Sequence, residues 1–166
     1  RTFPFFNSFR SMEKKRYKII ANAKISSRSD MVSVLLKKNM DVRKSIIKLY
    51  NKIDFTRGEV LRILEVNQFM KIIIDSTNMK YVHELFPKND IISTEQKLGE
   101  ISLIYDEEVE KIPGVFAALT SVLGLSSISI RDGVICGSEH IFIIKKDDLM
   151  KALETFYKIS KWGEKN

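Results

Sequence analysis

The feature that most constrains the fold is the order in which two kinds of apolar pattern alternate along the chain. Short β-branched runs, typical of strands, alternate with stretches whose apolar residues recur every three or four positions, typical of helices. Between residues 31 and 90 this order is β-α-β-β-α, and residues 91–162 repeat it. The runs expected to be strands are 31–36, 60–66, 69–74, 99–105, 128–135 and 140–144, with Ile91 and Ile92 opening an edge strand, and helices are expected after Asp41, from Met79 to Phe86, after Pro113 and after Asp147.

Two copies of one supersecondary order amount to an internal repeat. Antiparallel sheets with both helices on one face place the chain in the α+β class. One copy alone buries little apolar surface, so we expect the two copies to pack together. The expected domains are a basic N-terminal arm at residues 1–30, a first repeat at 31–90 and a second repeat at 91–162.

The N-terminal arm is strongly basic, with eight basic and two acidic side chains, whereas residues 91–166 carry nine and twelve. Its densest cluster is Lys14, Lys15, Arg16 and Lys18, which predicts weak, salt-sensitive contacts with nucleic acid phosphates. The stretch from Met12 to Asp30 is too short for a helix-turn-helix module. The alternative is a lysine-rich surface without a nucleic acid partner. Residues 1–12 are left out of the fold prediction because the chain does not begin with Met. We expect an added extension or a piece of a longer protein, with Met12 as a candidate start, and a processed targeting segment is the remaining alternative.

Several classes of protein are excluded by composition. One Cys rules out a disulfide framework and a multi-Cys zinc site, and no apolar run is long enough for a membrane helix. Neither a nucleophile elbow nor a nucleotide-binding glycine pattern is present, and Cys136 with His140 lacks an orienting third group. The acidic run of Glu107, Glu108 and Glu110 is expected to be a solvated loop. We therefore expect a cytoplasmic protein that is not an enzyme, with no cofactor and no metal.

Three segments of the second repeat resemble an ACT domain, a small βαββαβ module that senses amino acids. They are 110–119, which holds a Pro-Gly turn before a helix, 127–130 and 138–144. The tandem arrangement resembles the regulatory region at the C-terminal end of aspartate kinases. It is closer still to archaeal stand-alone regulators of amino acid metabolism. The resemblance covers residues 95–160, while residues 30–90 follow it in element order only. It implies two ferredoxin-like units and an amino acid effector bound allosterically at an interface between ACT units.

Gly114 is central to the ligand site that this resemblance implies. A helix N-terminus presents unpaired N–H groups and a partial positive charge to a carboxylate. Glycine leaves the backbone open to a ligand. We expect the turn at Pro113, Gly114 and Val115 to receive the effector's carboxylate, and Asp106 to pair with its amino group. Phe116, Ser129 and Arg131 complete the expected ligand-binding residues. The alternative is that Pro113 and Gly114 merely start a helix.

The sequence departs from the ACT pattern in three places. Ser129 stands where aspartate kinase ACT domains carry Asn, Gly133 interrupts a strand, and residues 39–41 of the first repeat replace the Pro-Gly turn. Asp41, read as an N-cap, would satisfy the helix N–H groups with its own carboxylate. Ligand binding is therefore expected in the second repeat alone.

The function expected from these observations is that of a non-catalytic, amino-acid-binding regulatory module. Exposed strand edges in a small sandwich also predict a symmetric homodimer. Two alternatives remain open at this point. One is an interaction, structural or DNA-associated module that has lost its ligand site, and the other is the regulatory fragment of an enzyme resembling aspartate kinase.

Overall fold

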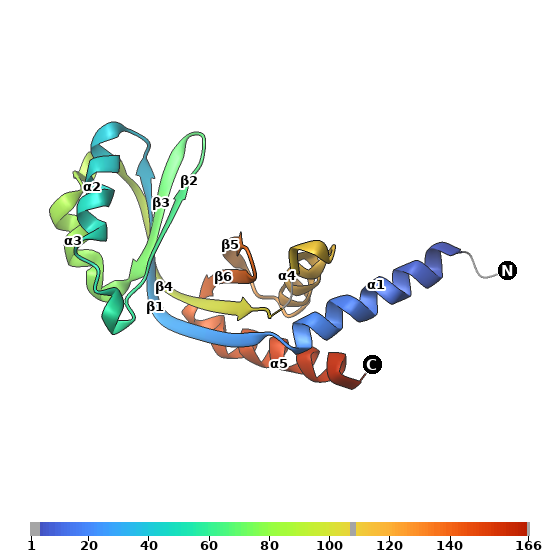
Figure 1. Cartoon of the computed structure of the whole chain (residues 1–166). Helices are drawn as coiled ribbons and strands as arrows, with labels where there is room; N and C mark the ends of the chain where they lie inside the picture. The colour runs from blue at the N-terminus through green and yellow to red at the C-terminus, as the bar shows by residue number, and fades with distance from the viewer. Residues whose placement is uncertain (1–3, 107–108, 166) are drawn as a thin grey trace. The chain divides into compact units, whose positions relative to one another are not determined.

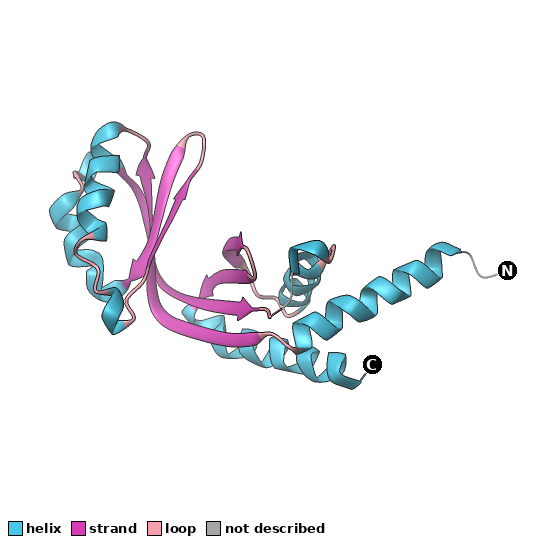
Figure 2. Cartoon of the chain, viewed as in Figure 1, coloured by secondary structure: helices cyan, strands magenta, loops and turns pink. Residues whose placement is uncertain are grey.

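The computed structural model describes residues 4–106 and 109–165, and it confirms the α+β class (Figures 1 and 2). Helices and strands alternate along the chain much as the apolar patterns predict. The helices are α1 (Pro4–Ala21), α2 (Met40–Tyr50), α3 (Met79–Leu85), α4 (Val115–Leu125) and α5 (Leu149–Lys165), and the strands are β1 (Lys24–Lys37), β2 (Leu61–Glu65), β3 (Phe69–Asp75), β4 (Ile91–Ile104), β5 (Ile130–Cys136) and β6 (Glu139–Lys145).

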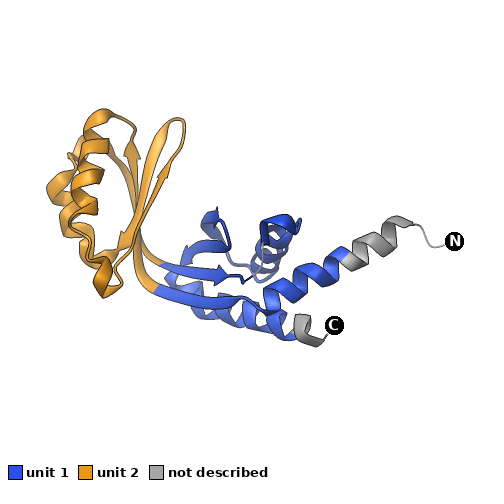
Figure 3. Ribbon diagram, in the orientation of Figure 1, with its two compact units in different colours: residues 1–28, 99–166 blue, residues 29–98 orange. Residues whose placement is uncertain are grey.

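The strands follow the order β2-β3-β1-β4-β6-β5, and the chain divides into two compact units (Figure 3). Unit 2 comprises residues 29–98 and contains the first repeat. Unit 1 comprises residues 1–28 and 99–166 and contains the second repeat. Unit 2 is therefore inserted into unit 1, with β1 and β4 passing from one to the other.

Unit 2 is a contiguous βαββαβ fold. β3 pairs antiparallel with both β1 and β2, with Ile72 opposite Val34 in one ladder and opposite Ile63 in the other. The buried side chains of α2 pack against this sheet because they recur on one helical face, as the sequence predicts. The core comprises Val32, Val34, Leu36, Val42, Ile46, Leu49, Ile53, Met70, Ile72, Ile74, Val82 and Phe86.

Unit 1 has the same strand and helix order, but its fourth strand comes from the start of the chain. β4, α4, β5, β6 and α5 follow in sequence, and residues 24–28 of β1 lie beside β4. α1 adds a further helix next to α4 and α5 (Figure 1). The core joins Ile19 and Ile20 of α1 to residues of all the other elements, among them Ile101, Leu103, Leu119, Leu123, Phe142, Ile144 and Phe156.

The domain boundaries therefore differ from those expected at residues 30/31 and 90/91. The expected basic arm is a helix and a strand of unit 1, with Ile20 fully buried. The two strand-like runs at 91–92 and 99–105 belong to one strand, β4. The sequence did not reveal these longer strands, because segments 24–30 and 93–97 are polar and extend β1 and β4 without an apolar pattern. Asp30 and Lys97, close to the two crossing points, both adopt positive φ angles, 61° and 56°.

Candidate functional site

The Pro113–Gly114 turn of unit 1 leads directly into α4. A short 3-10 helix, Val109–Lys111, precedes it, and Gly114 occupies the N-cap position with φ 84°. The helix begins two residues later than Pro113, its expected start. As the N-cap residue, Gly114 has no side chain that could cap the first turn of α4. The backbone N–H groups at this turn are therefore left to a partner other than the N-cap residue.

Arg16 of α1 packs against this turn. Its Nε donates a hydrogen bond of 2.8 Å to the carbonyl oxygen of Pro113. A Cβ built on Gly114 would lie 3.0 Å from Arg16 Nε and 3.2 Å from its Cζ. Glycine is therefore needed at this position for its positive φ and for the close approach of Arg16. The sequence analysis placed Arg16 among the residues expected to contact nucleic acid. Its hydrogen bond to Pro113 joins residues 97 positions apart, and no local sequence pattern indicates such a contact.

Asp106, the expected partner for an amino group, follows the end of β4. Its side chain is 71% exposed, and Oδ1 lies 3.9 Å from Lys24 Nζ on the neighbouring strand. Its pairing with a ligand stays a prediction. Glu107 and Glu108 of the acidic loop lie outside the described residues. Ser129 and Arg131 are exposed before and at the start of β5, and their contact with a ligand likewise stays a prediction.

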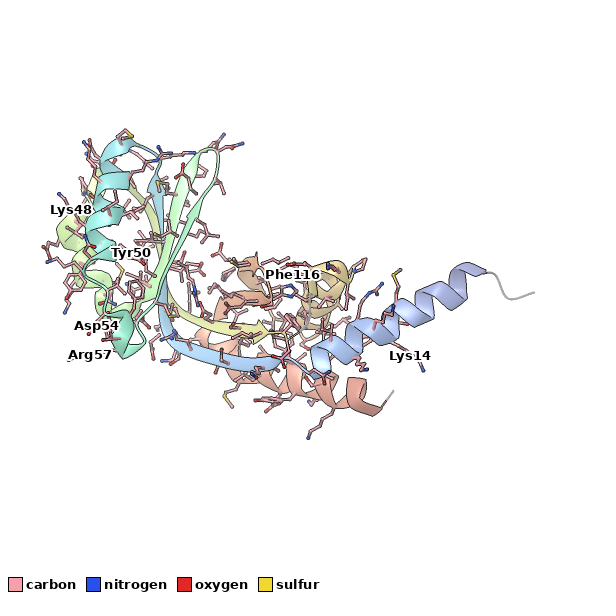
Figure 4. All side chains as sticks on the ribbon, viewed as in Figure 1. Lys14, Lys48, Tyr50, Asp54, Arg57 and Phe116 are labelled. Carbon is pink, nitrogen blue, oxygen red and sulfur yellow. The ribbon has the colours of Figure 1, made fainter. Side chains whose placement is uncertain are left out.

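A cluster of aromatic rings supports the first turn of α4. Phe116 stacks on Phe142 with ring centroids 5.1 Å apart and meets His140 edge-on at 5.4 Å. Its ring also rests on Gly133, where a Cβ would come within 2.8 Å of Phe116 Cζ. This contact explains why glycine interrupts β5, and Figure 4 shows Phe116 between α4 and the strands of unit 1.

Tyr105 and His140 form a buried polar pair beside Phe116. Tyr105 Oη lies 3.2 Å from His140 Nδ1, and both residues are 3% exposed. Burial raises the pKa of Tyr105 above its usual range and lowers the pKa of His140. His140 is therefore neutral near pH 7 and can share one proton with the phenol. His140 lies beside Tyr105, whereas Cys136, four residues before it in the sequence, is an exposed free thiol at the end of β5.

The corresponding turn of unit 2 is closed by its own side chains. Asn39, not Asp41, is the N-cap of α2, and its Oδ1 accepts a 2.8 Å hydrogen bond from the backbone N–H of Val42. Asn39 Nδ2 donates to Asp90 Oδ1 at 3.1 Å. Asp41 is exposed and pairs with Lys44 at 3.6 Å. The expected N-cap residue was wrong by two positions, because both side chains are good caps and the sequence offers no way to choose between them.

The remaining basic residues of the N-terminal cluster face solvent. Lys14, Lys15 and Lys18 are exposed on α1, and Figure 4 shows Lys14 projecting from the helix. Contact with nucleic acid stays a prediction for these three. Among residues 4–106 and 109–165, no helix is long and apolar enough to cross a membrane. Within the same part of the chain, His, Cys, Asp and Glu side chains form no group of three that could hold a metal ion.

Comparison with known proteins reveals likeness in structure and not in sequence. No family model matches the chain, and no curated protein matches it. The ligand-free regulatory subunit of aspartate kinase from Thermus thermophilus superposes with a TM-score of 0.61, at 9% identity, over 83% of this chain and 98% of that one.

Whole aspartate kinases match over the same region. The enzyme of Clostridium acetobutylicum gives a TM-score of 0.65 at 14% identity, over 81% of this chain and 34% of that one. E. coli aspartokinase III in complex with lysine and aspartate gives 0.55 at 15% identity, over 81% of this chain and 32% of that one. This chain thus spans about a third of the length of these enzymes. The expected fold of two ACT-like units is confirmed, although one unit is inserted into the other and the two do not follow each other along the chain.

Proposed function

We propose that this chain is a non-catalytic regulatory module that binds a free amino acid at the Pro113–Gly114 turn of unit 1. The observation that carries the proposal is the left-handed N-cap Gly114, which begins α4 and has no side chain of its own to cap the helix. The fold likeness to aspartate kinase regulatory subunits supports it. The complex of E. coli aspartokinase III with lysine and aspartate supports an amino acid as the effector.

The proposed site binds both charged groups of an amino acid, the carboxylate and the amino group. The N–H groups at the start of α4 would hold the carboxylate, since a helix N-terminus favours an anion. Asp106, at the end of β4, would hold the amino group, exchanging Lys24 for the ligand. Phe116, Ser129 and Arg131 would contact the side chain of the effector. Unit 2 would not bind, because Asn39 already caps α2.

We also propose that the effector turn of unit 1 lies at an interface between ACT units and, separately, that two copies of the chain form a symmetric homodimer through unit 2. β2 is an edge strand of unit 2. Its Ile63 is 43% exposed, and Ile47 and Tyr50 of α2 are exposed as well. Arg43 Nη2 lies 2.5 Å from Glu65 Oε1, which brings this face of α2 next to β2. A second copy would cover these apolar residues and pair with the open strand edge.

A regulatory fragment of an enzyme resembling aspartate kinase is the second candidate. The observation that favours it is the coverage, because the chain matches about a third of the length of two such enzymes. In that case the same turn would bind the effector, and effector binding would change the activity of a separate catalytic region. The third candidate function is that of an interaction module that binds no ligand.

Thermal-shift screening against the twenty amino acids tests the proposal. A ligand that binds only the folded chain raises the melting midpoint, and the rise grows with the logarithm of the ligand concentration above Kd. We expect one amino acid, or a small related group, to raise the midpoint, while its decarboxylated amine and its deaminated acid do not. The matched analogues test the requirement for both charges. If all twenty amino acids leave the midpoint unchanged at millimolar concentration, the proposed function is refuted.

A further inference from the structure

The side chain of Arg16 occupies the space through which the proposed effector would approach Gly114. The missing Cβ of Gly114 leaves one side of the backbone open, and the Nε, Cζ and Cδ atoms of Arg16 fill that side at 3.0, 3.2 and 3.6 Å from the ideal Cβ position. The hydrogen bond from Nε to Pro113 holds the guanidinium there. A ligand that reaches the turn from this side has to displace Arg16.

α1 is anchored to unit 1 independently of this contact. Ile19 and Ile20 lie in the core, and Ser160 of α5 donates a hydrogen bond to the carbonyl oxygen of Ile20 at 3.5 Å. These contacts hold the C-terminal end of the helix. Toward its N-terminus Lys14 and Lys15 are exposed, and Arg16 is the side chain that reaches the turn. Tyr17 packs against the same core, so the anchored part of α1 begins directly after Arg16, and only the part of the helix before Tyr17 lies outside it.

The contact between Arg16 and the turn is also weakened by electrostatics. The N-terminal end of α4 carries a partial positive charge, which favours an anion and disfavours a guanidinium. The N-cap residue Gly114 has no side chain to place a negative charge there. The hydrogen bond from Arg16 to the Pro113 carbonyl brings a positive charge to this helix end, where a negative charge would be favoured. A ligand carboxylate would supply this negative charge, so that exchange of Arg16 for the ligand is electrostatically favourable at the helix end.

We propose that α1 is a lid over the Pro113–Gly114 turn, latched by Arg16, and that effector binding releases it. The ligand side of this inference rests on the proposed function, whereas the latch itself rests on the geometry of Arg16. Occupancy of the turn and attachment of the first part of α1 exclude each other. The freed helix, with its exposed lysines, is then the element through which the chain signals its ligand state.

The latch is tested first without any ligand, by hydrogen exchange of the backbone amides of α1. Arg16→Ala removes the hydrogen bond, and Gly114→Ala pushes the guanidinium away with a new Cβ. Both variants should speed exchange in the part of α1 before Tyr17 by about two- to tenfold, the range set by one hydrogen bond. Lys15→Ala, an exposed neighbour on the same helix, should leave exchange unchanged. Wild-type exchange in Arg16→Ala overturns the latch.

The lid is tested next with the amino acid that raises the melting midpoint. Its addition to the wild-type chain should speed exchange in the same part of α1, and Arg16→Ala should bind it about two- to tenfold more tightly, because no latch has to be broken. Weaker binding by Arg16→Ala would show that the guanidinium holds the ligand, which overturns the lid. If no amino acid binds either chain, the proposed effector is refuted, and the ligand-free exchange rates still decide whether Arg16 latches α1.

Discussion

Replacing Gly133 with alanine tests how tightly the aromatic cluster supports the first turn of α4. A Cβ at this position would lie 2.8 Å from Phe116 Cζ and 3.7 Å from two further ring atoms. The ring has little freedom to retreat, since it stacks on Phe142 and meets His140 edge-on. Overpacking of this kind costs about 1–3 kcal/mol. We expect Gly133→Ala to lower the free energy of unfolding by that amount, measured by urea denaturation with circular dichroism.

Gly124 provides a matched control for the same substitution. It lies in the last turn of α4, and nothing comes within 4 Å of a Cβ built there. Gly124→Ala should therefore raise stability by about 0.5–1 kcal/mol, because alanine is the better helix former. Shortening the ring with Phe116→Leu should recover part of the loss in a double variant with Gly133→Ala. A Gly133→Ala chain as stable as the wild type would refute the close contact.

Three further predictions concern proton binding, capping and assembly. Burial lowers the pKa of His140, so the folded chain binds fewer protons than the unfolded chain. Stability should be complete above the unfolded value of about 6.5 and decline as the pH falls below it, and this decline should shrink in His140→Phe when urea midpoints are compared across pH. Asn39→Ala should lower the free energy of unfolding by about 1 kcal/mol, while Asp41→Ala, which removes an exposed carboxylate, should change it by less than about 0.5 kcal/mol in thermal melts. In light scattering at micromolar concentration, Ile63→Lys should be a monomer, whereas the wild type and the exposed control Leu125→Lys should be dimers.

The order of elements within each repeat could be predicted from the sequence, because the apolar periods of strands and helices differ. The α2 face of Val42, Ile46 and Leu49 is buried as that period requires. The insertion of unit 2 into unit 1 could not be predicted in the same way. Residues 24–28 join the sheet of unit 1 as a strand with no buried side chain, so its pattern carries no signal. Pairing between strands that are distant in sequence forms through backbone hydrogen bonds, so a local pattern of side chains does not predict it.

The candidate site was predictable only where a local rule applies. A Pro-Gly pair before an apolar helix locates the turn, and the left-handed Gly114 agrees with it. The contact of Arg16 with Pro113 and the contact of Gly133 with Phe116 join residues that are far apart in sequence. No local spacing of residues predicts them. The buried pairing of Tyr105 with His140 is a contact of the same kind.

The most direct measurement of the central claim is calorimetric titration of Gly114→Val with the amino acid that raises the wild-type melting midpoint. Gly58→Val is the matched control, because Gly58 has a similar φ of 78° and no neighbour within 4 Å of its ideal Cβ, so it carries the same backbone strain at a place in unit 2. We predict that Gly114→Val weakens binding by about 1–3 kcal/mol while Gly58→Val binds as the wild type does. Wild-type affinity in Gly114→Val would contradict the assignment of this turn as the effector site.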